Sequence, residues 1–144
     1  MASKNRVRMS FPASSENVSV ARVAAAAFAA QVDLTLNDLD EIRVAVSEAV
    51  SNAVIHGYRV SPGEVEVEFI LGDDRLEFVI TDHGCGIADI EQARRPSFST
   101  DPERMGLGFV FMESFMDELY VESAVGRGTT VRMVKKIPAS PAAH

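Results

Sequence analysis

The stretch "SEAVSNAVIHGY", residues 47–58, carries an apolar stripe and a polar stripe at the same helical spacing. Its polar stripe consists of Glu48, Asn52 and His56, which follow one another at intervals of one helical turn. Side chains spaced in this way project from nearly one face of a helix. Asn is a mediocre helix former because its amide competes for backbone partners. Its position inside a helix therefore raises the possibility of a role beyond solubility.

Working outward, residues 36–58 form the pattern of one long amphipathic helix with Asn37 as its expected N-cap and Gly57 at its end. The side chains expected on its buried face are Ile42, Val46, Ala49, Val50 and Ala53. Upstream, residues 6–11 alternate as a strand that Pro12 ends, and residues 18–32 form a helix that Ser14 or Ser15 could cap.

Downstream, "EVEVEFIL" (64–71) and "RLEFVITD" (75–82) alternate strictly and predict an antiparallel hairpin. A loop-like region over 84–105, with a short helix possible at 87–95, leads to a helix over 109–119 and to strands over 119–124 and 129–137. This order predicts the α+β class, a two-layer sandwich of a mixed, mainly antiparallel sheet with helices on one face. We expect a single domain over 1–137 and a disordered tail over 138–144.

The composition excludes several classes of protein. The net charge of -7 makes the chain a poor candidate for binding nucleic acid. The one basic cluster, "RMVKK" (132–136), is expected to be a strand with its charges facing solvent. The longest apolar run, residues 23–30, is too short to cross a bilayer, and the single cysteine, Cys85, reads as a small residue between two glycines rather than as a nucleophile. We expect a cytoplasmic protein without direct membrane or nucleic-acid binding.

Three glycine-containing motifs carry candidate chemistry. In "TDHGCGI" (81–87), Asp82 ends a strand and can accept a hydrogen bond from an amino group, while Gly84 and Gly86 let the backbone approach a ligand. An ordinary Asx turn would explain the same residues. The motif "GRGTTV" (126–131) by itself is a turn between two strands.

The third motif, "GLGF" (106–109), stands just before a helix, where backbone N–H groups can hold phosphate. A flexible helix entry is the alternative. The dinucleotide fingerprint fails here because Met112 and its neighbours supply no third glycine and no strand directly precedes the motif. The P-loop pattern is also absent from the sequence.

Taken in order, these motifs and the Glu48–Asn52 helix resemble the four boxes of the Bergerat (GHKL) ATPase superfamily, which includes histidine-kinase catalytic domains, gyrase, Hsp90 and MutL. Within this superfamily, the chain most resembles anti-sigma factors that double as serine kinases, the sporulation anti-sigma-F factors in particular. The stretches that carry this resemblance are "SEAVSNAVIHGY", "DHGCGIADIEQARRPSFST", "ERMGLGFVFMESFMDEL" and "GRGTTVRM". The resemblance covers nearly the whole chain.

The resemblance implies a site for ATP or ADP with Mg²⁺. Glu48 would be the general base and Asn52 the Mg²⁺ ligand, while Asp82 would bind the adenine amino group. The remaining nucleotide contacts that it implies are Gly84, Gly86, Ser99, Thr100, Arg104, Gly106, Gly108, Thr129 and Thr130. For the adenine-side contact, Thr129 and its neighbour Thr130 both remain open. His56 reads as a helix-end cation or packing residue.

The resemblance also implies partners. The protein would form a homodimer, hold a sporulation sigma factor (sigma-F) inactive, and phosphorylate a serine of an anti-anti-sigma factor. Arg22, on the first helix, would contact both of these partners. Two alternatives stay open, a stress-response anti-sigma kinase of the same superfamily and an anti-sigma module that binds nucleotide without catalysis.

Overall fold

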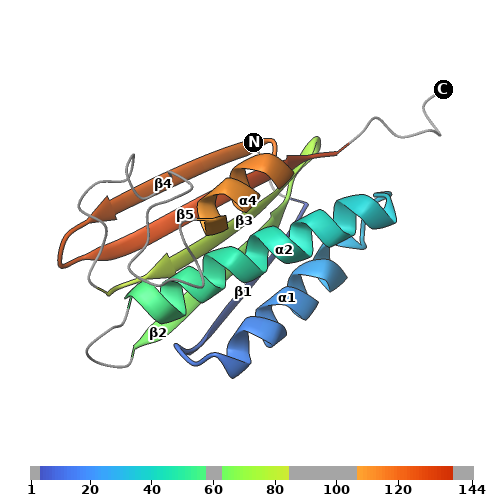
Figure 1. The fold of residues 1–144 in the computed structure, drawn as a ribbon. Helices are drawn as coiled ribbons and strands as arrows, with labels where there is room; N and C mark the ends of the chain where they lie inside the picture. Colours follow the sequence, from blue (N-terminus) through green and yellow to red (C-terminus); the bar gives the residue numbers. More distant parts are fainter. Residues whose placement is uncertain (1–3, 58–62, 85–106, 138–144) are drawn as a thin grey trace.

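The computed structural model of the protein describes residues 4–57, 63–84 and 107–137 (Figure 1). The expected helix at 87–95, Cys85 and the expected tail at 138–144 lie outside these described residues. The elements are β1 (Asn5–Pro12), α1 (Glu16–Ala29), α2 (Leu36–Asn52), η1 (Ala53–Gly57), β2 (Glu64–Leu71), β3 (Arg75–Asp82), α4 (Leu107–Phe115), β4 (Glu118–Ala124) and β5 (Gly128–Lys136).

The five strands form one sheet in the order β1-β2-β3-β5-β4. Figure 1 shows α1, α2 and α4 lying across one face of this sheet. The predicted α+β class with helices on one face is therefore confirmed. Every pairing among the described strands is antiparallel, so this part of the sheet is not mixed.

The core lies between the sheet and the helices. The strict alternation of β2 places Val65, Val67 and Phe69 inward, and all three side chains are buried. Phe69 contacts the rings of Phe28 on α1 and Phe78 on β3, with centroid separations of 5.6 and 5.7 Å. Aromatic pairs at such separations add to the stabilisation from buried apolar area. This cluster joins α1 to the centre of the sheet.

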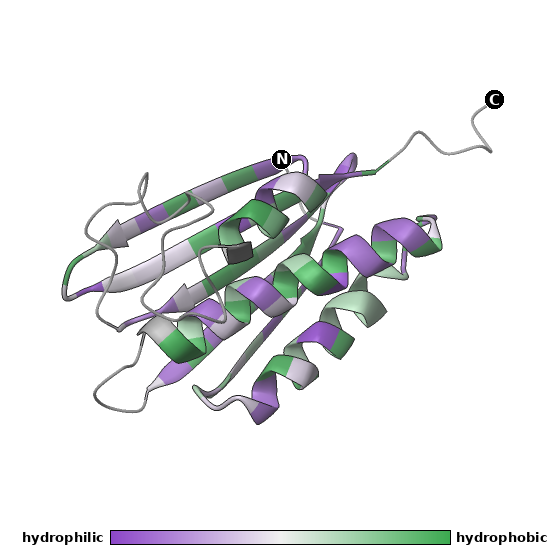
Figure 2. Cartoon of the chain, viewed as in Figure 1, coloured by the Kyte–Doolittle hydropathy of each residue, from purple (hydrophilic) through white to green (hydrophobic). Residues whose placement is uncertain are grey.

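α2 follows the sequence prediction on its buried face and departs from it at both ends. All five residues expected on the buried face are buried, and α2 shows both hydrophilic and hydrophobic residues along its length in Figure 2. The N-cap is Thr35 rather than Asn37, because Thr35 and Asp38 form a reciprocal capping box. At the other end the α-helix stops at Asn52 and continues as one π-helical turn, η1.

Lys135 corrects the expectation that the basic cluster faces solvent. The register of β5 on β3 places Lys135 opposite Leu76, on the face that the helices cover, and Lys135 is only 8% exposed. Neighbouring residues of a strand point to opposite faces. Two consecutive lysines therefore cannot both face solvent, and Lys136 is the exposed one.

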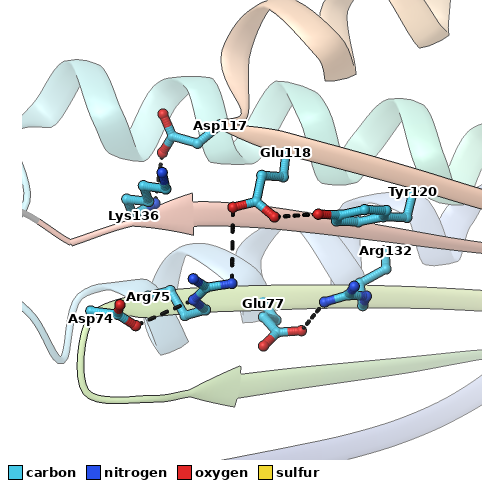
Figure 3. Close-up of polar contacts among 8 residues, drawn as sticks. All are labelled: Asp74, Arg75, Glu77, Asp117, Glu118, Tyr120, Arg132 and Lys136. Atoms are coloured by element: carbon cyan, nitrogen blue, oxygen red, sulfur yellow. Dashed lines mark hydrogen bonds and ion pairs between the residues drawn. The ribbon is translucent and has the colours of Figure 1, made fainter.

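The other face of the sheet carries a ladder of polar pairs between β3, β5 and β4 (Figure 3). Arg132 Nη1 lies 2.8 Å from Glu77 Oε1, and its guanidinium stacks 4.3 Å above the ring of Tyr120. Arg75 reaches Glu118 at 3.9 Å. Exposed pairs of this kind contribute little each, about 0–1 kcal/mol, so their main effect is to favour one register of the strands.

No described helix is long and apolar enough to cross a membrane.

Candidate functional site

The candidate site lies at one end of the sheet. Figure 1 shows the C-terminal end of α2, the end of β3 and the turn between β4 and β5 gathered at that end. η1 packs against both β3 and β5 there. The fold thus brings the end of the Glu48–Asn52 helix and the strand that ends in Asp82 to the same region.

A hollow of about 320 Å³ opens at the ends of β3, β4 and β5. It is lined by residues 81–83, 122–124 and 127–130. Asp82 and Thr129 both line it and are partners in the β3–β5 register. A hollow of this size is suited to a small organic ligand.

Asp82 is the most unusual polar residue of this region, since it is a carboxyl group that is only 5% exposed. Burial raises its pKa, while hydrogen bonds from the backbone N–H groups of Gly84 and Thr129 act in the opposite direction. The Gly84 N–H donates to Asp82 Oδ1 at 2.9 Å. A carboxylate can accept about four hydrogen bonds. Asp82 therefore has the capacity to accept a further bond from a ligand.

The strand register separates the two threonines that the sequence left as alternatives. Thr129 pairs with Asp82 and so shares its face, whereas Thr130 pairs with Thr81 on the opposite face. The hydroxyls of Thr130 and Thr81 lie 3.4 Å apart there. Thr129 is therefore the threonine that lies on the same face as Asp82.

Ser123 is a residue of the site that the sequence analysis missed. Its hydroxyl lies 2.8 Å from Thr129 Oγ1 and donates to the Gly128 carbonyl at 3.0 Å. These contacts hold the Thr129 side chain beside the hollow. The signal was present in the sequence, because closing the "VGRG" turn as a hairpin places Ser123 directly opposite Thr129.

Gly128 packs so closely on β3 that a side chain would not fit. Its φ is +104°, and a Cβ there would lie 2.1 Å from the carbonyl oxygen of Asp82. We expect Gly128→Ala to destabilise the fold by about 2–4 kcal/mol, since it combines a steric clash with an unfavourable backbone conformation. Chemical denaturation of the variant measures this loss.

Gly126 provides the matched control in the same turn. It also has a positive φ, +80°, but a Cβ there would have no atom within 4 Å. Gly126→Ala should cost only the backbone term, about 1 kcal/mol. Equal losses in the two alanine variants would contradict the close approach of Gly128 to Asp82.

The other predicted site residues are distributed as follows. Glu48 and Asn52 are half-buried on α2, and Gly108 is the second residue of α4. Arg22 is half-buried on α1, where it donates to Ser19 Oγ at 3.1 Å. His56 belongs to η1. Gly86, Ser99, Thr100, Arg104 and Gly106 lie outside the described residues.

The described residues contain no cluster of three or more His, Cys, Asp or Glu side chains arranged as a metal site. The predicted Mg²⁺ site does not need one. Mg²⁺ in nucleotide sites takes one or two protein oxygens and completes its shell with phosphates and water. The amide oxygen of Asn52 is a donor of the right type, so the residue fits such a role.

Comparisons with known proteins show the family of the chain. Residues 11–135 match the model of the histidine kinase-like ATPase domain. The chain is 51% identical to the anti-sigma F factor of Geobacillus kaustophilus (strain HTA426), covering 96% of this chain and 97% of that one. It is 46% identical to the anti-sigma F factor of Bacillus subtilis (strain 168), with the same coverage.

Among solved structures, the RsbU and RsbW domains of Rv1364c from Mycobacterium tuberculosis match with a TM-score of 0.64 at 21% identity, covering 94% of this chain and 33% of that one. The histidine kinase domain from Erythrobacter litoralis EL346 blue-light activated histidine kinase matches with a TM-score of 0.58 at 19% identity, covering 88% and 62%. These two likenesses concern the fold. The sequence matches over nearly the full chain establish that it belongs to the anti-sigma F factor family of histidine kinase-like ATPase domains.

Proposed function

We propose that this protein is an ATP-dependent serine kinase that also acts as an anti-sigma factor. It binds ATP or ADP at the candidate site, holds a sporulation sigma factor (sigma-F) inactive, and phosphorylates a serine of an anti-anti-sigma antagonist. The observation that carries the proposal is the buried Asp82 carboxyl, which lines the hollow at the same end of the sheet as the end of α2.

Asp82 is the residue that recognises adenine in this proposal. Its carboxylate accepts a hydrogen bond from the exocyclic amino group, in addition to the Gly84 N–H bond that it already accepts. Thr129, which shares its face of the sheet, supports the base through its hydroxyl or a bridging water. A site that holds a buried hydrogen-bonding group in this way discriminates strongly against ligands without the matching donor.

The phosphates extend from the adenine toward α2 and α4. Asn52 offers its amide oxygen to Mg²⁺, and the first N–H groups of α4, including Gly108, favour negative charge at the helix N-terminus. Gly84, Gly86, Ser99, Thr100, Arg104 and Gly106 complete the proposed nucleotide contacts. Mg²⁺ bound to ATP neutralises the phosphate charge that develops during transfer.

Glu48 is the proposed general base. It lies one helical turn before Asn52 on the same face of α2. A base and a metal ligand that act on the same phosphate need such a shared face. Its carboxylate takes the proton of the substrate serine as the serine oxygen bonds to the γ-phosphorus. The bond between that phosphorus and the bridging oxygen breaks, and ADP leaves.

The partners are proposed from the family. The relatives that match over nearly the full chain are named anti-sigma F factors, and that name implies a sigma factor as the partner. Arg22 on α1 is the proposed contact for the sigma factor and for its antagonist. A homodimer is proposed as the active form, and the protein is proposed to act in the cytoplasm.

A transfer experiment tests the enzymatic part. The purified protein is incubated with γ-labelled ATP, Mg²⁺ and an anti-anti-sigma protein, and the labelled residue is identified by mass spectrometry. We expect label on a serine, and loss of labelling when Mg²⁺ is removed with EDTA. ATP binding without any transfer would instead favour an anti-sigma module that lacks catalysis.

A further inference from the structure

Lys135 is a buried lysine that the proposed function leaves unexplained. Its side chain is 11% exposed and lies at the end of the sheet opposite to the hollow. An ammonium group taken out of water is costly unless charged and hydrogen-bonding partners compensate it. The partners of Lys135 therefore indicate what the residue does in this fold.

The ammonium group of Lys135 joins three elements. Nζ donates to the carbonyl oxygen of Phe115 at 2.8 Å and to Glu41 Oε1 at 3.1 Å, and Asp38 Oδ1 lies at 3.8 Å. Phe115 is the last residue of α4, while Glu41 and Asp38 belong to the first turns of α2. One charge on β5 thus ties the end of α4 to the beginning of α2.

The contact with Phe115 fixes the end of α4 that lies away from the proposed phosphates. The last carbonyls of a helix lack partners within the helix, and a cation there is favourable to the helix dipole. α4 has only nine residues and packs on α2. A short helix held at its C-terminal end has less freedom to shift along α2 or tilt, so this contact adds to the core packing of α4 in fixing the place of its N-terminus.

The contact with Glu41 acts on the stripe of α2 that holds the proposed base and metal ligand. Glu48 and Asn52 follow Glu41 by seven and eleven residues, or about two and three helical turns. At about 100° per residue, all three project within roughly 40° of one another. A partner that fixes the direction of Glu41 therefore favours one rotation of α2 about its axis.

We infer that Lys135 is a positioning residue for the phosphate end of the nucleotide site, acting through α4 and α2. The inference rests on the proposed function, because the N-terminus of α4 and Asn52 are the groups proposed to meet the phosphates. Adenine, by contrast, is proposed to meet Asp82 on β3. Asp82 lies at the other end of the sheet from Lys135. Loss of Lys135 should therefore weaken the binding of phosphates and leave the binding of the nucleoside unchanged.

The test compares ATP, ADP and adenosine as titrants of the full chain by calorimetry, well below the melting temperature of each variant. For Lys135→Met we expect about 5- to 20-fold weaker binding of ATP and ADP, and adenosine binding within about twofold of the unsubstituted protein. Lys135→Arg keeps a cation with donors and should recover most of the ATP affinity.

Lys136→Met is the matched control. It makes the same substitution at the next residue of β5, where the side chain is exposed. The contact drawn for Lys136 in Figure 3 is its backbone N–H donating to Asp117 Oδ2 at 2.6 Å, which the substitution retains. All three ligands should bind Lys136→Met as they bind the unsubstituted protein.

The outcomes separate the inference from the proposed function. Equal weakening of ATP and adenosine in Lys135→Met, or no weakening of ATP, would overturn the role of Lys135 while leaving the nucleotide site intact. Failure of the unsubstituted protein to bind ATP would instead contradict the proposed function. If Lys135→Met does not fold, Glu41→Gln removes one of the two carboxylates, and the same selective loss of ATP affinity, smaller in size, is expected.

Discussion

Glu48→Gln should lower the rate of serine phosphorylation by at least about 100-fold while ATP binding stays within about threefold. Glutamine keeps the size and shape of glutamate but cannot take up the serine proton at neutral pH. Because the two side chains have nearly the same volume, the substitution at half-buried Glu48 removes the charge without opening a cavity. Single-turnover transfer from labelled ATP measures the chemical step, and calorimetry measures binding.

Asp40→Asn is the control for the loss of a carboxylate on the same helix. Asp40 is exposed and pairs with Arg43 one turn further along α2. Such a pair stabilises a helix by only about 0.2–0.5 kcal/mol, so transfer should be unaffected. If Glu48→Gln transferred phosphate at the normal rate, the proton would have another acceptor and the assignment of the base would be wrong.

The fold was largely predictable because its strands have one buried face. In β2 and β3 the alternation of apolar and polar residues fixes both the register and the inward face. The capping box at Thr35 was missed because Asn37, a residue type equally suited to an N-cap, stands two positions further along the chain. The buried position of Lys135 was missed because strand register, and not composition, decides which of two adjacent lysines faces the core.

The candidate site was predictable only where a residue's role follows from its place along the chain. Asp82 ends a strand two residues before Gly84, a pattern that indicates either a ligand-facing carboxyl or an Asx turn, and the structure has the Asx turn. The choice between Thr129 and Thr130 depends on how β5 pairs with β3. Pairing between strands so far apart in sequence is a property of the folded sheet, which local patterns do not specify.

Asp82→Asn should weaken ATP binding by about 10- to 100-fold, because it replaces a charged acceptor of the adenine amino group with a neutral amide. The same loss should appear with adenosine, which carries the same amino group. This sets the variant apart from Lys135→Met, which is expected to affect only ligands with phosphates. GTP and guanosine, which lack the amino group at that position, provide the ligand control and should bind both proteins weakly.

The same substitution should change how the stability of the free protein depends on pH. Burial raises the pKa of Asp82 above its ordinary value of 3.8, so the folded state binds the proton more tightly than the unfolded state does. The contribution of this group to stability is therefore complete below the ordinary pKa and is lost as the pH rises through the folded pKa. Asparagine has no such loss, so the melting temperature of Asp82→Asn relative to the unsubstituted protein should increase between pH 3 and pH 7.

Asp73→Asn is the control for this pH dependence, because Asp73 is exposed and forms a surface ion pair with Lys4, at 3.5 Å. Its melting temperature relative to the unsubstituted protein should change little over the same range. A difference for Asp82→Asn that stayed constant or fell with pH would mean that the Gly84 and Thr129 N–H groups outweigh burial. If the prediction holds, ionisation of the Asp82 carboxyl lowers the stability of the free protein as the pH rises toward neutral. A charge kept in a position that costs stability is understandable if it serves a ligand, and adenine binding would then offset that cost.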